Sequence, residues 1–357
     1  MRLLIITQKV DKDDPILGFF HRWIEEFSKN VESVIVICLQ KGAYNLPKNV
    51  EVHSLGKEKL IIPHSPFIIL NKLRYVFNFY KLIFKLRNDY GSVFVHMNPE
   101  YLVLGGVPWR FWDKKIGLWY VHRAVNFRIW LAEKFTNVIF TSTLESFRLK
   151  SKKVSFVGHG IDISKFNCEQ KYLSDKIILL HVGRITKIKN CDVAIRALPK
   201  IIKNFPDKKM VLRFVGPTVS DEDVVYLETL KKLVEDLELG EDVEFVGSVN
   251  NKEVYKEYCA CDATLNMTPT GGMDKVVLES LASKRPVFTS NPTFSAVLRS
   301  VDGAIFNYND SEDLSKKISD FIRRDGKIDG LNQVYENVRR DFSLTNLVVG
   351  ICKTIYG

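Results

Sequence analysis

The feature of this sequence that most limits its fold is a regular alternation of short apolar runs with segments of helical periodicity. Residues 17–29, for example, carry Phe20, Trp23, Ile24 and Phe27 at helical spacing between two such runs. The runs of strand length in the first half are 2–7, 33–39, 92–97, 117–122 and 136–142. Strands that alternate with helices form a parallel sheet covered by helices on both faces. The first half of the chain therefore predicts an α/β domain.

The second half repeats this pattern after a polar stretch without periodicity at residues 165–175. Its apolar runs are 176–183, 210–216, 243–247, 263–267 and 286–290, and its helical segments are about 191–204, 224–237, 251–261 and the segment from Asp274. A chain of 357 residues is also too long for one ordinary core and suits two. We predict two α/β domains, at residues 1–168 and 169–340.

The cysteines are scattered and include no CxxC pair or spaced metal-binding set. They are Cys38, Cys168, Cys191, Cys259, Cys261 and Cys352. This pattern predicts free thiols in a reducing compartment and no metal site. No apolar run reaches the roughly 20 residues that a membrane span needs, and the chain starts with a strand-like run in place of a signal peptide. We expect a cytoplasmic protein.

Basic residues follow the apolar run at 176–183, where a strand would lead into its helix. In open α/β sheets, ligands bind at the carboxyl ends of the strands. Gly183 precedes Arg184, which offers a fork of donors to phosphate oxygens, and Lys189 adds a point charge. Charge alone is equally compatible with a solvated basic loop.

A glycine pair opens a predicted helix within TPTGGMDKVVLESLAS, residues 268–283. Gly271 and Gly272 let the backbone approach a ligand closely, and the N–H groups at a helix start attract an anion. Glu279 lies about one and a half turns inside this helix. Its two carboxylate oxygens can accept from both hydroxyls of a ribose, although an ordinary surface glutamate would occupy such a position too.

Several segments of the second half occur in the order and at the spacing of a known family. VGRITKIKNCDVAIRAL, LRFVG, VEFVGSV and GGMDKVVLESLASKRPVFTSN resemble the C-terminal domain of the family-four retaining glycosyltransferases, the glycosyl transferases group 1, which have the GT-B fold. VGHGIDISKF, residues 157–166, resembles the segment that precedes this domain in the family. The similarity covers residues 117–291 well and the remainder loosely.

The resemblance implies a GT-B architecture, in which two Rossmann-like domains with parallel sheets face each other across a cleft. The final segment, 341–357, would form a helix that packs back on the first domain. The reaction would move a hexose from a nucleotide diphosphate sugar, linked to UDP or GDP, to an acceptor hydroxyl with retention at the anomeric carbon. The resemblance implies no metal and no cofactor besides this substrate.

The family also implies roles for particular residues of the second domain. Arg184 and Lys189, after Gly183, would bind the donor diphosphate and stabilise the charge that grows on it as the sugar leaves. Glu279 would hold the ribose, and Val249 would flank the base. In the first domain, the family usually has a histidine where His122 stands, close to the donor sugar, and Gly18 would lie near the diphosphate or the acceptor. Without the family, His122 would be read as an ordinary strand-end histidine.

This sequence departs from the family at one carboxylate. The usual order of glutamate, glycine, phenylalanine and glycine is here Gly271, Gly272, Met273 and Asp274. The missing glutamate normally contacts hydroxyls of the donor sugar. Either Asp274 or Lys275 replaces that contact, or the sugar is held otherwise.

The positive charge is confined to the first half. Residues 1–168 contain 25 Lys and Arg against 14 Asp and Glu, a net charge of +11, whereas the remainder carries −1. Two segments, 66–87 and 108–130, interleave basic with large apolar residues. This composition suits a helix on anionic lipid, and it also suits an amphipathic helix packed on its own sheet. The charge favours a membrane-surface acceptor such as a lipid-linked sugar or a surface-glycan precursor.

Three other functions fit less well. A dinucleotide-dependent oxidoreductase would have GxGxxG after its first strand, and none occurs there. A nucleic-acid-binding protein would explain the isoelectric point near 9.1, but the ordered motifs lie in the half without excess charge, so we expect no nucleic-acid partner. The third alternative, suggested by Gly271, is a degenerate GT-B protein that binds nucleotide sugars without turnover.

Overall fold

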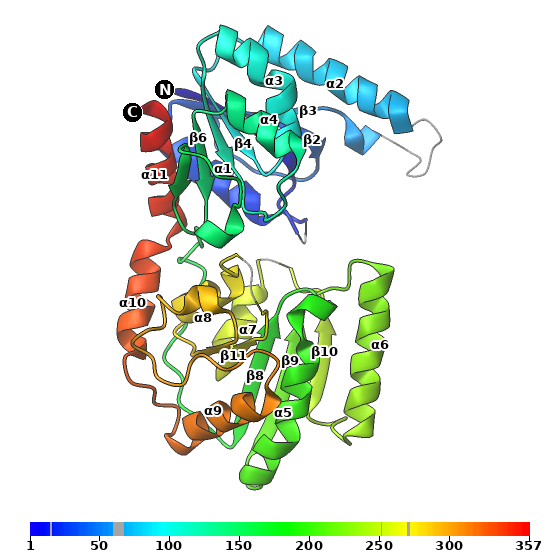
Figure 1. The fold of residues 1–357 in the computed structure, drawn as a ribbon, viewed down its shortest axis with the longest axis vertical. Helices are drawn as coiled ribbons and strands as arrows, with labels where there is room; N and C mark the ends of the chain where they lie inside the picture. Colours follow the sequence, from blue (N-terminus) through cyan, green and yellow to red (C-terminus); the bar gives the residue numbers. More distant parts are fainter. Residues whose placement is uncertain (15, 60–67, 251, 270–271) are drawn as a thin grey trace. The chain divides into compact units, whose positions relative to one another are not determined.

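The computed structural model describes residues 1–14, 16–59, 68–250, 252–269 and 272–357. The chain divides into two compact units, of which the first comprises Met1–Gly160 and Leu344–Gly357 and the second Ile161–Ser343 (Figure 1). The boundary expected between residues 168 and 169 therefore falls inside the second unit. Both units contain a parallel sheet flanked by helices, which confirms the predicted α/β fold class.

The first unit is built on a seven-stranded parallel sheet with the order β3-β2-β1-β4-β5-β6-β7. Its strands are β1 (Arg2–Val10), β2 (Ser33–Lys41), β3 (Val50–Ser54), β4 (Ser92–His96), β5 (Lys115–Trp119), β6 (Val138–Thr141) and β7 (Val154–Phe156). Its helices are α1 (Phe19–Asn30), α2 (Ile68–Lys85), α3 (Pro99–Phe111), α4 (Phe127–Phe135) and α11 (Leu344–Tyr356).

Alternate residues of β1 point to opposite faces of this sheet and pack in two different cores. Leu3 and Ile5 are buried in a core shared with α1 and α11, which contact each other. Leu4 and Ile6 are buried in a second core with side chains of α2, α3 and α4. Because successive side chains of a strand point to opposite faces, a strand covered on both faces reads as one continuous apolar run.

The second unit contains a five-stranded parallel sheet with the order β10-β9-β8-β11-β12. Its strands are β8 (Lys176–Val182), β9 (Lys209–Val215), β10 (Val243–Gly247), β11 (Ala263–Asn266) and β12 (Val287–Thr289). Its helices are α5 (Cys191–Asn204), α6 (Asp221–Asp236), α7 (Val254–Ala260), α8 (Lys275–Ala282), α9 (Ser311–Arg323) and α10 (Leu331–Asp341).

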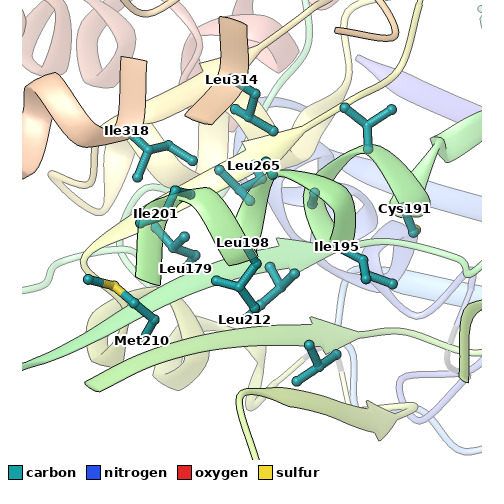
Figure 2. Packing of buried hydrophobic residues seen from close by; sticks show 14 of the residues in the cluster. Leu179, Cys191, Ile195, Leu198, Ile201, Met210, Leu212, Leu265, Leu314 and Ile318 are labelled. Atoms are coloured by element: carbon teal, nitrogen blue, oxygen red, sulfur yellow. The ribbon is translucent and has the colours of Figure 1, made fainter. Parts of the chain in front are cut away.

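Two cores also flank this second sheet. Leu179 and Leu212 pack with Leu198 of α5 and Ile318 of α9 on one face (Figure 2). Leu180 belongs to the core on the other face, which it shares with side chains of α7, α8 and α10. The helices α7 and α8 are thereby held next to the strand ends where the predicted donor residues lie.

The prediction that every cysteine is a free thiol is wrong for one pair. Cys168 and Cys259 form a disulfide with their Cα atoms 5.2 Å apart. The other four cysteines are buried free thiols, and burial raises the pKa of Cys191 and of Cys261 to about 12. The cysteine pattern therefore no longer supports a reducing compartment. Among the described residues, no helix is long and apolar enough to cross a membrane.

The disulfide closes a long loop and should stabilise the second unit. The two cysteines are 91 residues apart, so the bond removes much conformational entropy from the unfolded chain. We expect the double variant Cys168→Ser, Cys259→Ser to lose about 2–4 kcal/mol of unfolding free energy in urea denaturation. Dithiothreitol should lower the wild-type midpoint and leave that of the variant unchanged, whereas equal sensitivity of both proteins would show that the bond does not form in solution.

Candidate functional site

Two glycines end the central strands of the second sheet and bring their loops together. Gly183 follows β8 with a φ of +146°, and Gly216 follows β9 with a φ of +155°. A Cβ atom on Gly216 would lie 1.8 Å from the carbonyl oxygen of Gly183. Only glycine fits this approach. The loop that begins at Gly183 is therefore tied to the neighbouring strand end, and this loop carries the predicted phosphate-binding residues.

Lys189 lies in the short 3-10 helix Lys187–Lys189 and is directed at the start of α8. Its Nζ lies 3.2 Å from both carboxylate oxygens of Asp274 and 3.2 Å from Oγ1 of Thr268. Two residues of the predicted site, 85 positions apart, are thus joined in an ion pair. The Lys189 ammonium and the Asp274 carboxylate are both largely buried, with 17% and 24% of their side chains exposed.

Asp274 is the centre of a polar network at the strand ends. Asn266, the last residue of β11, donates from Nδ2 to Asp274 Oδ2 at 3.0 Å, and Thr289 of β12 donates to Asn266 Oδ1 at 2.8 Å. Burial acts to raise the pKa of Asp274, but the charge of Lys189 and the hydrogen bonds from Asn266 and Thr268 outweigh it, and the pKa is lowered. The carboxylate is therefore ionised at neutral pH.

The sequence reasoning missed Asn266, Thr268 and Thr289 as members of this network. The signal was available, because polar residues at the ends of otherwise apolar runs mark the ligand edge of a parallel sheet. His181 was also missed. Its Nδ1 lies 3.2 Å from the carbonyl oxygen of Leu265, and burial, with the charge of Lys189, lowers its pKa to about 4.

The other predicted residues of this loop region lie at different depths. Arg184 is exposed on the loop after β8. Met273 and Val249, the latter just after β10, are partly buried against the core that contains α7 and α8. The carbonyl oxygen of Gly272 accepts from Asn291 Nδ2 at 3.3 Å, while Gly271 lies outside the described residues.

Glu279 lies on α8, and its carboxylate is bound by a tyrosine of α7. The hydroxyl of Tyr258 donates to Glu279 Oε2 at 2.9 Å. Burial raises the pKa of Glu279, although the hydrogen bond from Tyr258 and the charges of Lys275 and Lys165 act in the opposite direction. Burial also lowers the pKa of Lys275 to about 8, against the charge of Glu279. The predicted ribose-binding carboxylate is therefore partly buried and bound to a tyrosine that we had not predicted.

Gly18 and His122 belong to the first unit. A Cβ on Gly18 would lie 2.5 Å from the carbonyl oxygen of Asp14, so close packing accounts for this glycine. The strand predicted at 117–122 ends earlier, at Trp119, because its neighbour β4 ends at His96, which pairs with Trp119. His122 is therefore an exposed loop residue, and its Nδ1 accepts a hydrogen bond from the backbone N–H of Ala124 at 3.0 Å.

Comparison with known families identifies this half of the chain. Residues 164–341, which contain the Lys189–Asp274 network and Glu279, match the model of the glycosyl transferases group 1. They belong to this glycosyltransferase family. The family predicted from the sequence is thus confirmed, and the described residues of the second unit that were predicted to bind the donor all lie within the matched range.

Known glycosyltransferases resemble the chain over part or all of its length. A GDP-mannose-dependent alpha-(1-6)-phosphatidylinositol monomannoside mannosyltransferase of Mycolicibacterium smegmatis is 25% identical over 46% of this chain and 45% of its own. An alpha-monoglucosyldiacylglycerol synthase of Streptococcus pneumoniae is 27% identical over 43% of this chain and 36% of its own. The aligned part is thus less than half of either relative.

A solved structure extends the similarity in fold to the whole chain. The Anabaena protein Alr3699/HepE was solved in complex with UDP and superposes on this chain with a TM-score of 0.76 and 15% sequence identity. The superposition covers 100% of both chains. At that identity the likeness concerns the fold, and it agrees with the predicted GT-B architecture of two parallel-sheet units.

Replacing Asp274 with asparagine should destabilise the second unit, because Lys189 would lose its counter-charge. We expect a loss of about 1–3 kcal/mol in unfolding free energy at pH 7. Since the folded-state pKa of Asp274 lies below its ordinary value of 3.8, the contribution is present above that pH and is lost as the pH falls through the folded-state pKa. The difference between wild type and variant in urea denaturation should therefore shrink toward pH 3.

The matched control for this prediction is Glu235→Gln, which removes an exposed acid from α6. Such surface substitutions usually change stability by less than about 0.5 kcal/mol. If Asp274→Asn behaved like Glu235→Gln at pH 7, the ion pair with Lys189 would contribute nothing.

Proposed function

We propose that this protein is a retaining glycosyltransferase that moves a hexose from a UDP- or GDP-linked sugar to an acceptor hydroxyl. The observation that carries the proposal is the polar network at the carboxyl ends of β8, β11 and β12, which joins Lys189 to Asp274 next to the helix of Glu279. Parallel α/β sheets bind ligands at this edge. Support also comes from the Anabaena protein of similar fold, which was solved with UDP and with UDP-glucose.

In this proposal the donor diphosphate binds over the loop after β8. Arg184 projects from an exposed position and provides paired donors for phosphate oxygens. Lys189, fixed by Asp274, adds a positioned positive charge. Both cations stabilise the negative charge that develops on the diphosphate as the sugar leaves, so the step needs no metal ion. Glu279 accepts from the ribose hydroxyls, and Val249 flanks the base.

In this proposal the protein recognises the donor sugar without the glutamate that the family usually has where Gly271 stands. Both oxygens of Asp274 already accept from Lys189, and one also accepts from Asn266. This engagement leaves Asp274 fewer acceptor positions for the sugar hydroxyls. His122 and Gly18 would serve from the first unit, near the donor sugar and near the diphosphate or the acceptor.

A thermal-shift panel of UDP, GDP and their sugar conjugates tests the donor site. A ligand at about 100 times its Kd stabilises the folded protein by about 2.7 kcal/mol, so the true donor should raise the Tm clearly. Arg184→Ala and Glu279→Ala should reduce this shift. The matched control is Arg196→Ala, an exposed arginine of α5 in the same unit, which should retain the full shift.

Two outcomes would contradict parts of this proposal. A flat response across the panel would overturn the donor site, and an unreduced shift in both site variants would show that other residues bind the donor. Turnover is tested separately by analysing sugar release and the anomeric configuration of the product. If the protein bound nucleotide sugars but transferred no sugar, the result would support the alternative of a degenerate GT-B protein, in which Gly271 replaces the usual glutamate.

We further propose that the acceptor lies at the cytoplasmic face of a membrane, as a lipid-linked sugar or a surface-glycan precursor. The surface of α2 supports this. Its exposed apolar side chains include Leu70, Leu73, Phe77 and Phe84, and Phe77 is 68% exposed. They recur at intervals of three, four and seven residues and so share one side of the helix.

The charges of α2 match an anionic surface. Lys72, Arg74, Lys81 and Lys85 are exposed on the same helix, whose sequence contains no acidic residue. Apolar side chains interleaved with cations bind the interface of anionic bilayers. The two curated relatives described above also carry lipids in their names, phosphatidylinositol monomannoside and diacylglycerol.

Co-sedimentation with vesicles that contain phosphatidylglycerol tests this membrane surface. Wild type should bind at low salt, and the double variant Leu73→Glu, Phe77→Glu should bind about tenfold more weakly or worse, because it loses apolar burial and adds repulsion. Val225→Glu, an exposed position on α6, should bind like wild type. Failure of wild type to co-sediment at low salt would overturn the membrane proposal and leave the donor site untouched.

A further inference from the structure

We infer that Tyr258 is a positioning residue that holds the carboxylate of Glu279 in the orientation needed to bind the donor ribose. This inference rests on the proposed function and assigns a role in the same site. Tyr258 lies on α7, Glu279 on α8, and the hydroxyl of Tyr258 donates to Oε2 at 2.9 Å. Neither the resemblance nor the spacing of the sequence pointed to Tyr258.

The burial of Tyr258 indicates that this hydrogen bond belongs to the packed interior and is not a chance contact between exposed side chains. Its side chain is only 1% exposed, among the largest fully buried side chains of the protein. A buried hydroxyl needs a partner, and Glu279 supplies it. A hydrogen bond to a carboxylate is stronger than one between neutral groups, so it selects one orientation of the Glu279 side chain.

The backbone around Tyr258 is fixed by its neighbours in the chain. The adjacent Cys259 is linked to Cys168 by the disulfide. The buried Arg285 bridges the same two segments, because it donates from Nη2 to the carbonyl oxygen of Cys259 and from Nη1 to that of Glu169, both at 2.9 Å. Two cross-links, one covalent and one not, therefore tie the end of α7 to residues 168 and 169.

The ring of Tyr258 is also held in place. Phe166 packs edge-on against it with the ring centroids 5.6 Å apart. With both backbone and ring constrained, the hydroxyl presents a fixed donor to Oε2. A carboxylate has about four acceptor positions, so Glu279 keeps the capacity to accept from ribose hydroxyls while Tyr258 occupies one of them. Ordering the acceptor in advance lowers the entropy cost of binding.

The test compares nucleotides that have and lack ribose hydroxyls. Calorimetric titration would use UDP or GDP, whichever binds wild type, and its 2′,3′-dideoxy analogue. Tyr258→Phe keeps the ring and removes only the hydroxyl. We expect it to raise the Kd of the natural nucleotide by about 5–10-fold and to leave the Kd of the dideoxy analogue unchanged. Adding Tyr258→Phe to Glu279→Gln should have little further effect.

The controls separate positioning from packing. Tyr255→Phe removes a hydroxyl three residues earlier on α7 and should change neither Kd. Equal weakening of both nucleotides by Tyr258→Phe would mean that Tyr258 only supports the fold, and no weakening of either would exclude the role altogether. If wild type binds neither UDP nor GDP, the proposed function fails and this inference fails with it, whereas nucleotide binding that ignores Tyr258→Phe overturns the inference alone.

Discussion

The ion pair between Lys189 and Asp274 is the interaction on which the proposed donor site of this protein depends. A lysine whose side chain is mostly buried needs a counter-charge, and Asp274 is the carboxylate beside it. The pair connects the loop after β8 to the N-cap residue of α8, and Asn266 and Thr289 extend it to the ends of β11 and β12. The loop after β8 is thereby fixed at one edge of the sheet to three segments that lie about 80–100 residues later in the chain.

This arrangement gives the two predicted cations different physical roles. Arg184 is exposed, so its guanidinium is hydrated and able to turn toward an arriving phosphate. Lys189 is already paired, so it gains less from an added anion but is held where it is needed. Charge stabilisation by preorganised groups avoids reorganisation during the reaction. In the proposed donor site, the ion pair would fix the position of Lys189, and Arg184 would supply the larger change in electrostatic energy when a diphosphate binds.

The positions of most strands could be predicted from the sequence, whereas the contacts between side chains of the site could not. Buried parallel strands read as apolar runs, so β1, β2 and β8 were visible, whereas the short outer strands β3 and β7 lack such a run. Cys168 and Cys259 are brought together only by the fold, across 91 residues. Tyr258 looked like any apolar position of a helix. Arg184, Lys189 and Glu279 were predicted from the order of the motifs along the chain, but the side chains that contact Lys189 and Glu279 depend on packing.

The exchange of residues at positions 271 and 274 changes where a negative charge lies. In the usual family pattern the carboxylate stands at the first of these positions and glycine at the second, and here the order is reversed. The segment keeps one carboxylate, but it now neutralises Lys189. In the proposed donor site, Asp274 would offset the charge of Lys189, so Arg184 and the backbone N–H groups would hold more of the diphosphate's charge. The same exchange would leave the sugar hydroxyls without the acceptor that the family usually has, so the proposed site is better defined for the nucleotide than for the sugar.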